Sequence, residues 1–520
     1  MRDTWKSRST FLLAAIGSAV GLGNAWRFPG LASKHGGGAF LLVYLIALMS
    51  VGIPMLMAEI AIGRKVRRGA PGSMQALHPK AEPIGWMGVA NGFFIQIYYA
   101  AVFAWVILMF FMSWKFAGLT GNPTEASQLW ATTISTTGTT SGFTTVSWPM
   151  LGCLLLGWAV CFLCIRNGTA SVSKVIKYIV CLPVICLLIL AVRGFTLPGA
   201  GEGLIKLFVP DWSALSDSTL WIDAFGQVFY SMSVSMGIMF AYGSFVREDA
   251  NIAVDSLIVA GSDLLVSIIS SVVMFTTMAG VGMLGKMTDS GISTAFIVYP
   301  QAIVMLSDIP WLNALFGYVF YFCLITLAID SVFSIVEGVS TAVSDKFSLK
   351  KKHTTRVLCL ISLVLGLVYI TGGGLAILDI VDYAINNYAL LLTGVAQAAT
   401  IGWCFKTARV TEEINRNGKS FRMSDTWMKI SLKYVAPGML FAVFAWNLVT
   451  LFTGGGVYGA EDGYSVAANL VMGWGVVILI LLSGLIIKAV AKARAKKGFP
   501  EEQITWEGGH KTEEAVNEAE

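Results

Sequence analysis

Four carboxylates lie deep inside long apolar stretches of the sequence, and these are Glu59, Asp263, Asp330 and Glu337. Because an ionised side chain at the centre of a bilayer costs about 3 kcal/mol, such residues are rarely there for packing. Serine residues flank Asp263 and Asp330, and a carboxylate beside hydroxyl oxygens suits a hard cation. We expect Asp263 and Asp330 to bind cations, whereas Glu59 and Glu337 are open to either a cation-binding or a helix-tethering role.

Two of the apolar stretches are interrupted in matching ways. Residues 17–24 read GSAVGLGN and residues 231–237 read SMSVSMG, although a glycine in a helix interior costs about 1 kcal/mol relative to alanine. A break frees backbone groups that lipid cannot satisfy, so they must meet ligands or water. Amides near Leu22 and Gly23 suit an anion, and the carbonyls before them suit a cation. Close helix packing is the alternative explanation for the small residues, and it is weaker because the two breaks correspond.

The composition defines the surroundings in which these residues act. Of 520 residues, 56% are hydrophobic and 13% are charged, against about 25% charged in soluble proteins, and the mean hydropathy is +0.71. These values exclude a soluble globular chain and a disordered one. A net charge of +5 without interleaved basic and aromatic residues excludes a nucleic-acid partner. The chain is expected to be an integral membrane protein with the lipid bilayer as its solvent.

Twelve segments have the length of a membrane-spanning helix, which is about 20 apolar residues. They lie near residues 9–33, 39–62, 85–113, 146–165, 178–196, 220–245, 252–285, 309–344, 357–374, 378–404, 430–453 and 466–490. The stretch 290–308 is apolar but short, and Gly291 and Pro300 break it. We expect a re-entrant or capping loop there and not a thirteenth span.

Lysine and arginine residues predict the orientation of these spans. With the N-terminus inside, all but six of the 36 fall in cytoplasmic segments, and the exceptions are Arg27, Lys34, Lys115, Arg193, Lys206 and Lys286. Both termini are therefore expected in the cytoplasm, in a multi-pass protein of a prokaryotic inner membrane. Because five spans separate the two breaks, we expect an inverted repeat. Its halves are residues 1–200 with spans 1–5 and residues 201–408 with spans 6–10, followed by spans 11 and 12 and a cytoplasmic tail in residues 409–520.

Several motifs together resemble one known family. They are GSAVGLGNAWRFPG at 17–30, GGGAF at 36–40, GIP at 52–54, SFVR at 244–247, Tyr98-Tyr99, Trp221, Gly226-Gln-Val-Phe229 and Asp330-Ser331. On these residues the chain resembles the neurotransmitter:sodium symporter family over essentially its whole length. The resemblance implies an all-α integral membrane protein of the LeuT-type fold, with twelve transmembrane helices, an inverted five-helix repeat and broken first and sixth helices. It also implies a sodium-coupled amino-acid symporter that works by alternating access, and not an enzyme.

The resemblance implies two sodium ions. The first would be held by Ala19, Asn24, Ser231 and Asp263, together with the carboxylate of the substrate. The second would be held by Gly17, Val20, Leu327, Asp330 and Ser331. Oxygen-only donor sets of this kind suit a hard cation.

A substrate pocket is implied by the same resemblance. The residues that would bind substrate are Ser18, Ala19, Gly21, Leu22, Gly23, Ile95, Tyr99, Tyr230, Ser231, Ser233, Met236, Ser331 and Ile335. The Leu22 and Gly23 amides with the Tyr99 hydroxyl would hold a carboxylate. Gly21 indicates an amino acid as substrate, because amine-transporting members carry an aspartate there. The apolar members of the set favour a hydrophobic or aromatic amino acid. A symporter of small amino acids such as glycine or alanine, and a non-transporting amino-acid sensor on the same fold, are the alternatives.

The resemblance also implies gates on both sides of the pocket. The outer gate would comprise Tyr99 and Tyr230 with the pair Arg27 and Asp382. The inner gate would comprise the pair Arg2 and Asp345 with Trp5 as a plug.

Three residues depart from the pattern of the bacterial leucine transporter of this family. Phe245 replaces a tyrosine near the inner gate, Ser235 replaces a pocket glycine and is expected to narrow the pocket, and Asp263 replaces an asparagine at the first sodium site. Chloride-dependent members bind the anion at groups that match Tyr44, Gln227, Ser231 and Ser267. All four are present, but the fixed negative charge of Asp263 would repel chloride in a low-dielectric site. We therefore expect no chloride requirement.

Overall fold

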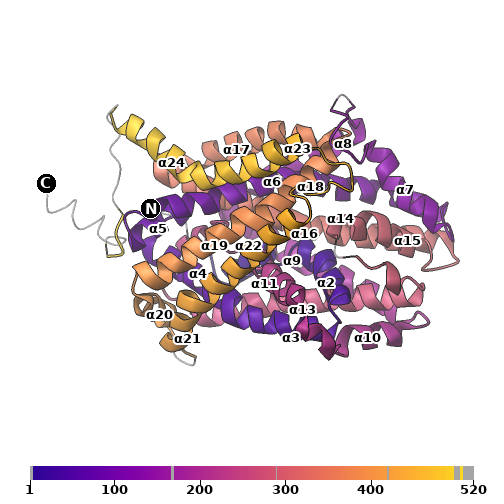
Figure 1. Cartoon of the computed structure of the whole chain (residues 1–520), viewed down its shortest axis with the longest axis horizontal. Coiled ribbons are helices and arrows are strands. Elements are labelled where there is room, and N and C mark those ends of the chain that lie inside the picture. Colours follow the sequence, from indigo (N-terminus) through magenta and orange to yellow (C-terminus); the bar gives the residue numbers. More distant parts are fainter. Residues whose placement is uncertain are drawn as a thin grey trace.

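The computed structural model describes residues 4–143, 145–165, 169–288, 290–418, 421–496 and 504–507. Within these ranges the chain is almost entirely helical, and its β-structure is limited to two isolated bridges. Most of the long helices run along the long axis of the molecule (Figure 1). The helical architecture agrees with the all-α class expected from the sequence.

The α-helices follow one another along the chain without any domain of a different architecture between them. They are α1 (Arg8–Ala19), α2 (Phe28–Lys34), α3 (Gly38–Ala47), α4 (Ile53–Val66), α5 (Ala70–Leu77), α6 (Glu82–Met112), α7 (Pro123–Ile134), α8 (Trp148–Ile165), α9 (Thr169–Phe195), α10 (Ala200–Phe208), α11 (Ser218–Ser231), α12 (Ile238–Ser244), α13 (Ile252–Gly280), α14 (Gly291–Ser293), α15 (Tyr299–Ile303), α16 (Pro310–Phe347), α17 (Lys351–Gly366), α18 (Gly374–Ala384), α19 (Leu390–Ala399), α20 (Thr407–Asn415), α21 (Asp425–Ile430), α22 (Ala436–Thr453), α23 (Val466–Ala468) and α24 (Gly475–Ala495).

Short π-helical and 3₁₀ segments join or extend several of these helices. The π-helical segments are η1 (Gly23–Arg27), η2 (Leu48–Gly52), η6 (Thr294–Val298), η8 (Ile385–Ala389), η9 (Thr400–Cys404), η10 (Ser431–Val435) and η11 (Asn469–Trp474). The 3₁₀ segments are η3 (Ser113–Ala117), η4 (Trp212–Ser216), η5 (Leu284–Lys286) and η7 (Leu367–Ile370).

Ten helices of the described chain are long and apolar enough to cross a membrane. They are Gly38–Val66, Glu82–Ala117, Trp148–Ile165, Ser171–Phe195, Ile252–Gly280, Pro310–Phe347, Lys351–Ile370, Gly374–Cys404, Asp425–Thr453 and Val466–Ala495. The helices α1 and Gly23–Lys34, which meet at a bend of 52°, reach the same length and apolar composition when they are taken together as one broken helix. The remaining segment expected from the sequence, 220–245, is divided between α11 and α12, and each half is shorter than a full span.

Polar residues just before a helix set where several helices begin. The Ser7 hydroxyl accepts a hydrogen bond from the Thr10 N–H at 3.2 Å and so caps α1. Asn251 caps α13 in the same way through the Val254 N–H, also at 3.2 Å. Such caps satisfy backbone donors that the first turn of a helix leaves without partners.

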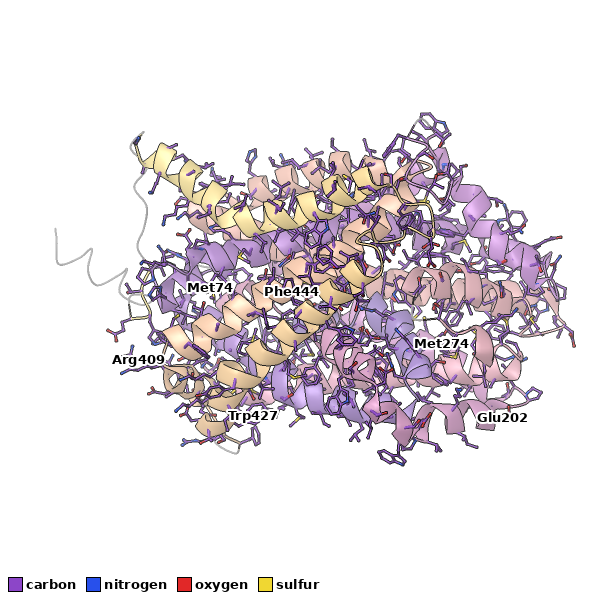
Figure 2. The ribbon with its side chains drawn as sticks, in the orientation of Figure 1. Met74, Glu202, Met274, Arg409, Trp427 and Phe444 are labelled. Atoms are coloured by element: carbon purple, nitrogen blue, oxygen red, sulfur yellow. The ribbon has the colours of Figure 1, made fainter. Side chains whose placement is uncertain are left out.

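The connecting helices gather at the two ends of the helix bundle. Helices α5, α20 and α21 lie at one end, and α7, α10 and α15 lie at the other (Figure 1). The side chains of Met74 and Arg409 mark the first of these, the α5/α20 end, and Glu202 marks the opposite end (Figure 2).

The segment 504–507 returns to the α5/α20 end after the last long helix. Trp506 is only 9% exposed, and its ring centroid lies 4.9 Å from that of Phe405. Glu507 pairs with Arg409 at 3.5 Å, and a Cβ built on Gly72 of α5 would lie 2.9 Å from Ile504. This part of the tail therefore bridges α5 and the start of α20.

The helical stretch Gly291–Ile303 is shorter than a membrane span, as the sequence predicts for residues 290–308. Its Phe296 ring stacks on Trp130 of α7 at a centroid distance of 5.0 Å and lies edge-on to Trp105 of α6 at 5.9 Å. The same ring lies 6.3 Å from Trp26 of η1. Aromatic pairs at such distances add to the apolar burial, so this short stretch is fixed over the first broken helix.

Helices α4 and α12 approach each other closely, which creates a direct test of the packing. A Cβ built on Gly63 would lie 2.2 Å from the Phe240 carbonyl oxygen, and one on Gly243 would lie 2.5 Å from the Ile60 carbonyl oxygen. We expect Gly63→Ala to lower the free energy of unfolding by about 2 kcal/mol, because neither backbone can yield without loss of packing. Thermal unfolding of the purified protein in detergent measures the effect.

Gly261→Ala is the matched control, since a Cβ on this exposed face of α13 meets nothing within 4 Å. Its melting temperature is expected to equal that of the wild type or to exceed it slightly. Equal melting temperatures for the two variants would contradict the close packing of α4 against α12.

Candidate functional site

The first break lies between α1 and η1, where side chains replace the missing backbone partners. Val20 has extended backbone torsions. The Gly21 N–H, which in a continuous helix would donate to the Gly17 carbonyl, instead donates to Asn24 Oδ1 at 2.8 Å. The Leu22 N–H donates to the Tyr99 hydroxyl at 3.4 Å. The break therefore presents amides toward Tyr99 and releases a carbonyl of α1 from its usual helical partner.

The second break lies between α11 and α12. Ser233, Ser235 and Gly237 all have positive φ angles, of 52°, 60° and 76°, a conformation that residues other than glycine rarely adopt. The Ser233 hydroxyl donates to the Ser18 carbonyl at 2.8 Å. The two breaks are thus in direct contact.

Glu59 of α4 holds the second break in its strained conformation. Its Oε1 accepts the Ser235 N–H at 2.7 Å and the Gln397 amide of α19 at 2.6 Å. Both the carboxylate and the break are buried. The sequence leaves Glu59 open to a cation-binding or a helix-tethering role, and these hydrogen bonds are those of a helix tether.

Asp263 of α13 is the centre of a buried polar cluster. Its Oδ1 accepts hydrogen bonds from Asn24 Nδ2 and from the Ser231 hydroxyl, both at 2.7 Å. The Tyr44 hydroxyl donates to Oδ2 at 3.2 Å, and Asn24 Nδ2 lies 2.7 Å from the Ser267 hydroxyl. The structure therefore brings together the side chains expected at the first sodium site with three of the four groups expected to surround chloride.

Asp330 of α16 contrasts with Asp263. Its two carboxylate oxygens are buried and have no hydrogen-bond partner in the part of the chain that the structure describes. A Cβ built on Gly17 would lie 1.2 Å from Asp330 Oδ2, so the carboxylate occupies the space that glycine leaves on α1. The Ser331 hydroxyl donates to the Leu327 carbonyl at 3.4 Å. A bare carboxylate next to glycine and to backbone carbonyls is a donor set for a hard cation.

One cavity lies between the two breaks and has a volume of about 40 Å³. Its lining contains all of the residues expected to bind substrate, namely Ser18, Ala19, Gly21, Leu22, Gly23, Ile95, Tyr99, Tyr230, Ser231, Ser233, Met236, Ser331 and Ile335, with Asn24 added. Ser235 does not line it, because its N–H is turned to Glu59. The expectation that Ser235 narrows the pocket is therefore wrong.

A second, larger cavity of about 330 Å³ lies beside the first and shares two lining residues with it, Tyr99 and Tyr230. The two tyrosines therefore separate the cavities. Arg27 and Asp382 line the larger one, where the Arg27 guanidinium lies 5.6 Å from the centroid of the Tyr230 ring. Asp382 accepts a hydrogen bond from Asn386 at 2.8 Å.

Trp5, the expected plug of the inner gate, is buried against the end of α12. It is 2% exposed, its N–H donates to the Phe245 carbonyl at 3.0 Å and its indole N–H donates to the Tyr242 carbonyl at 3.2 Å. Asp345 accepts the Gly69 N–H at 2.8 Å. Arg2, its expected partner, lies outside the described residues.

Sequence reasoning missed three side chains that support the site. Gln397 completes the Glu59 tether, and Arg67 donates to the Ser244 and Val246 carbonyls at the end of α12. Lys351 pairs with Glu337. Gln397 could have been found, because it is a polar residue inside the apolar stretch 378–404. Arg67 and Lys351 lie at polar helix ends, where a charged residue gives no such signal.

Two broken helices in contact around a cavity, in a chain with buried carboxylates, are the arrangement that is expected of a secondary transporter. In agreement with this, the sequence pattern of the sodium:neurotransmitter symporter family matches residues 2–120 and 117–495. The chain belongs to this family and is a sodium-dependent, multi-pass membrane symporter.

Its relatives extend over most of the chain. A sodium-dependent transporter of Methanocaldococcus jannaschii is 30% identical over 488 residues, which are 92% of this chain and 97% of the relative. A sodium- and chloride-dependent taurine transporter of Canis lupus familiaris is 31% identical over 492 residues, 86% of this chain and 78% of the relative. The crystal structure of MhsT in complex with L-phenylalanine has a TM-score of 0.74 at 30% identity and covers 86% of this chain and 99% of its own.

The Glu59 tether generates a prediction about stability. Glu59→Ala leaves the buried Ser235 N–H without its acceptor and should lower the free energy of unfolding by about 2 to 3 kcal/mol. Glu59→Gln keeps one carbonyl oxygen in place and should lose less. Thermal unfolding in detergent should give melting temperatures that fall from the wild type to Glu59→Gln and then to Glu59→Ala. A Glu59→Ala variant as stable as the wild type would exclude the tether.

Proposed function

We propose that this protein couples the uptake of hydrophobic or aromatic amino acids to sodium by alternating access. The observation that carries the proposal is the cavity between the two breaks, whose walls include Ile95, Met236 and Ile335. Apolar walls with a few placed polar groups are typical of ligand pockets. The complex of MhsT with L-phenylalanine supports the same class of substrate.

The polar end of the cavity supports a zwitterionic substrate. The Leu22 and Gly23 amides begin a helical segment, and together with the Tyr99 hydroxyl they suit a carboxylate. The carbonyls at the C-terminal end of α11, near Tyr230 and Ser231, suit an ammonium group. The lining contains no acidic side chain, so the substrate supplies its own negative charge.

Sodium is a co-substrate in this proposal and binds at two places. Asn24, Ser231 and Asp263 with the Ala19 carbonyl form the first site, which the substrate carboxylate completes. The second is formed by Asp330 and Ser331 with carbonyls of Gly17, Val20 and Leu327. The fit of the second site is supported by the bare carboxylate of Asp330 and by the loss of the helical partner of Gly17.

Direct contact between ion and solute explains how the two are coupled. Sodium binds more tightly at the first site when the substrate carboxylate is present. The substrate must then bind more tightly, by the same factor, when sodium is present. The outer side of the pocket is closed by Tyr99 and Tyr230, and beyond them by Arg27 and Asp382. The two tyrosines line both cavities and so separate them. On the inner side Trp5, with the pair Arg2 and Asp345, closes the exit.

In the proposed topology the protein crosses an inner membrane twelve times, and both termini lie in the cytoplasm. The twelfth span is the broken pair α11 and α12, added to the eleven that meet the criteria of length and composition. The α5/α20 end then faces the cytoplasm. Residues 1–200 and 201–408 form the inverted repeat, each beginning with its broken helix.

Chloride independence is supported by the direction of the hydrogen bonds around Asp263. The Tyr44 and Ser231 hydroxyls donate to its carboxylate, and the Ser267 hydroxyl donates to its carbonyl at 3.0 Å. Two of the four groups that would bind chloride thus already donate to the Asp263 carboxylate, and a third, Ser267, donates to a main-chain carbonyl. The names of the relatives do not decide the matter, since the taurine transporter is named chloride-dependent.

Uptake into proteoliposomes under an inward sodium gradient tests the function. Labelled tryptophan and leucine should accumulate with sodium and not with potassium, and Asp330→Ala should reduce accumulation to background because the second cation site loses its only carboxylate. Accumulation of glycine or alanine instead would assign the protein to small solutes, and binding without accumulation would assign it to sensors. Wild-type uptake in the Asp330→Ala variant would refute the second site.

Replacement of chloride by gluconate on both sides of the membrane is expected to leave the uptake rate unchanged. Asp263→Asn removes the fixed charge and frees two hydroxyl donors, so this variant should transport only when chloride is present. The measurement is initial uptake at a fixed sodium concentration. Loss of wild-type uptake in gluconate would overturn chloride independence.

A further inference from the structure

Helix α20 lies in the connection between α19 and α22, and a π-helical turn stands at each end of that connection. The turns are η9, which follows α19, and η10, which precedes α22. They touch each other, because the Trp403 indole N–H donates to the Lys433 carbonyl at 2.6 Å and a Cβ built on Gly402 would lie 2.7 Å from the Leu432 carbonyl oxygen. Helices bend at π-helical turns, so α20 is joined to the long helices through two adjoining bends.

A buried arginine of α4 binds α20. The side chains of Arg64 and Glu413 are 1% and 7% exposed, and Arg64 Nε donates to Glu413 Oε1 at 2.7 Å. Nη2 of the same guanidinium donates to the Glu413 carbonyl, and Nη1 donates to the Ala250 carbonyl at 2.8 Å. Because a guanidinium is planar and rigid, it fixes the directions of all three acceptors. Arg64 therefore holds α4, α20 and the connection before α13 together.

The C-terminal end of α20 is bound to the same connection. The Asn417 amide donates to the Ala250 carbonyl at 3.1 Å and to the Glu248 carbonyl. Arg416 pairs with the Glu248 carboxylate at 3.5 Å. Together with the Arg64 contacts, these bonds hold α20 against the connection between α12 and α13.

Helices α4 and α12 behave as one unit, which we call the α4/α12 unit. Their backbones meet at Gly63 and Gly243 without room for a Cβ. Arg67 at the end of α4 donates to the Ser244 and Val246 carbonyls at 3.1 and 2.7 Å. Helix α12 is the second half of a broken helix beside the cavity, so it must move when the cavity opens toward the α5/α20 end, and α4 must move with it.

We propose that Arg64 is a positioning residue for the transport cycle, which makes α20 part of the α4/α12 unit so that α20 moves with α12 when the cavity opens toward the α5/α20 end. The proposal rests on the proposed transport function, which gives that opening its meaning. The bends at η9 and η10 allow the movement, because they separate α20 from α19 and α22.

The competing explanation is that α20 stays with the helices that come before it in the chain. Helix α19 is bonded to α6 through Asn91 and Thr393 at 2.9 Å, and α17 is bonded to α6 through Gln96 and Ser362 at 2.7 Å. In that case α20 keeps a constant distance from α17, and the contact between Arg64 and Glu413 breaks as α4 moves. The two explanations predict opposite results for distances measured from α20.

Electron–electron double resonance between spin labels on the full-length protein in lipid nanodiscs measures these distances. The labels are attached to Glu412→Cys of α20 paired with Leu265→Cys of α13, and to Glu412→Cys paired with Lys352→Cys of α17. All three positions are exposed, and serine replaces the exposed Cys181 and Cys404 in every protein. Each pair is measured with sodium and with potassium in its place, because an ion that binds one state better shifts the population when it is removed.

The distance from α20 to α13 should stay the same in both salts, and the distance from α20 to α17 should change by about 5 Å, which is one helical turn. The double variant Arg64→Met with Glu413→Gln removes the ion pair without leaving a buried charge unpaired. In this variant the distance from α20 to α13 should change with the salt as well. Arg409→Gln is the matched control, because it removes an exposed charge from the same helix, and its distances should equal those of the wild type.

A constant distance from α20 to α17, with or without a change in the distance to α13, would overturn the proposal. So would equal effects of the double variant and of Arg409→Gln. Uptake by the wild type is measured in parallel. Absence of amino-acid uptake together with the expected distances refutes the proposed function and not the role of Arg64, whereas normal uptake with a constant distance from α20 to α17 refutes the role of Arg64 alone.

Discussion

The need to satisfy backbone groups at two helix breaks, in surroundings that contain little water, governs the rest of this structure. An unpartnered amide or carbonyl in an apolar medium costs free energy comparable to a lost hydrogen bond. The chain meets this cost with side chains from distant elements: Asn24 receives the Gly21 amide, Tyr99 the Leu22 amide and Glu59 the Ser235 amide. The supporting helices are therefore arranged around the breaks, and the groups of the described chain that keep no protein partner, such as the Asp330 carboxylate, are those that the proposed function assigns to ions.

Buried carboxylates differ in role because their surroundings differ. Glu59 receives an amide from the second break and another from α19, which makes it a tether. Asp263 is surrounded by donors, whereas Asp330 has none in the described part of the chain. The same chemical group therefore serves as a structural acceptor, as part of a polar cluster and, in the proposed second sodium site, as a bare cation ligand. Its environment, and not its residue type, distinguishes these cases.

Much of the site could be predicted from the sequence, because its signals are local. Glycine and serine runs mark both breaks, and aspartates stand out in apolar stretches, so the breaks and the two carboxylates were expected from the residues themselves. The cavity lining was expected from the family resemblance. The supporting contacts were not, since Glu59 and its partner Gln397 are 338 residues apart. The positive φ of Ser235 likewise turns its backbone to Glu59 and away from the cavity, which no composition rule reveals. The division of 220–245 into two short helices, in contrast, was expected from the run of small residues at 231–237.

The returning tail has a consequence for how the molecule is made. Trp506 covers the Phe405 ring, and Ile504 packs beside Gly72 of α5, which is among the first helices to be synthesised. The α5/α20 end therefore cannot reach its final packing until nearly the whole chain has left the ribosome. Insertion of the individual helices and completion of this surface are separate events in time, and the apolar groups that the tail covers stay accessible to chaperones and proteases in the interval.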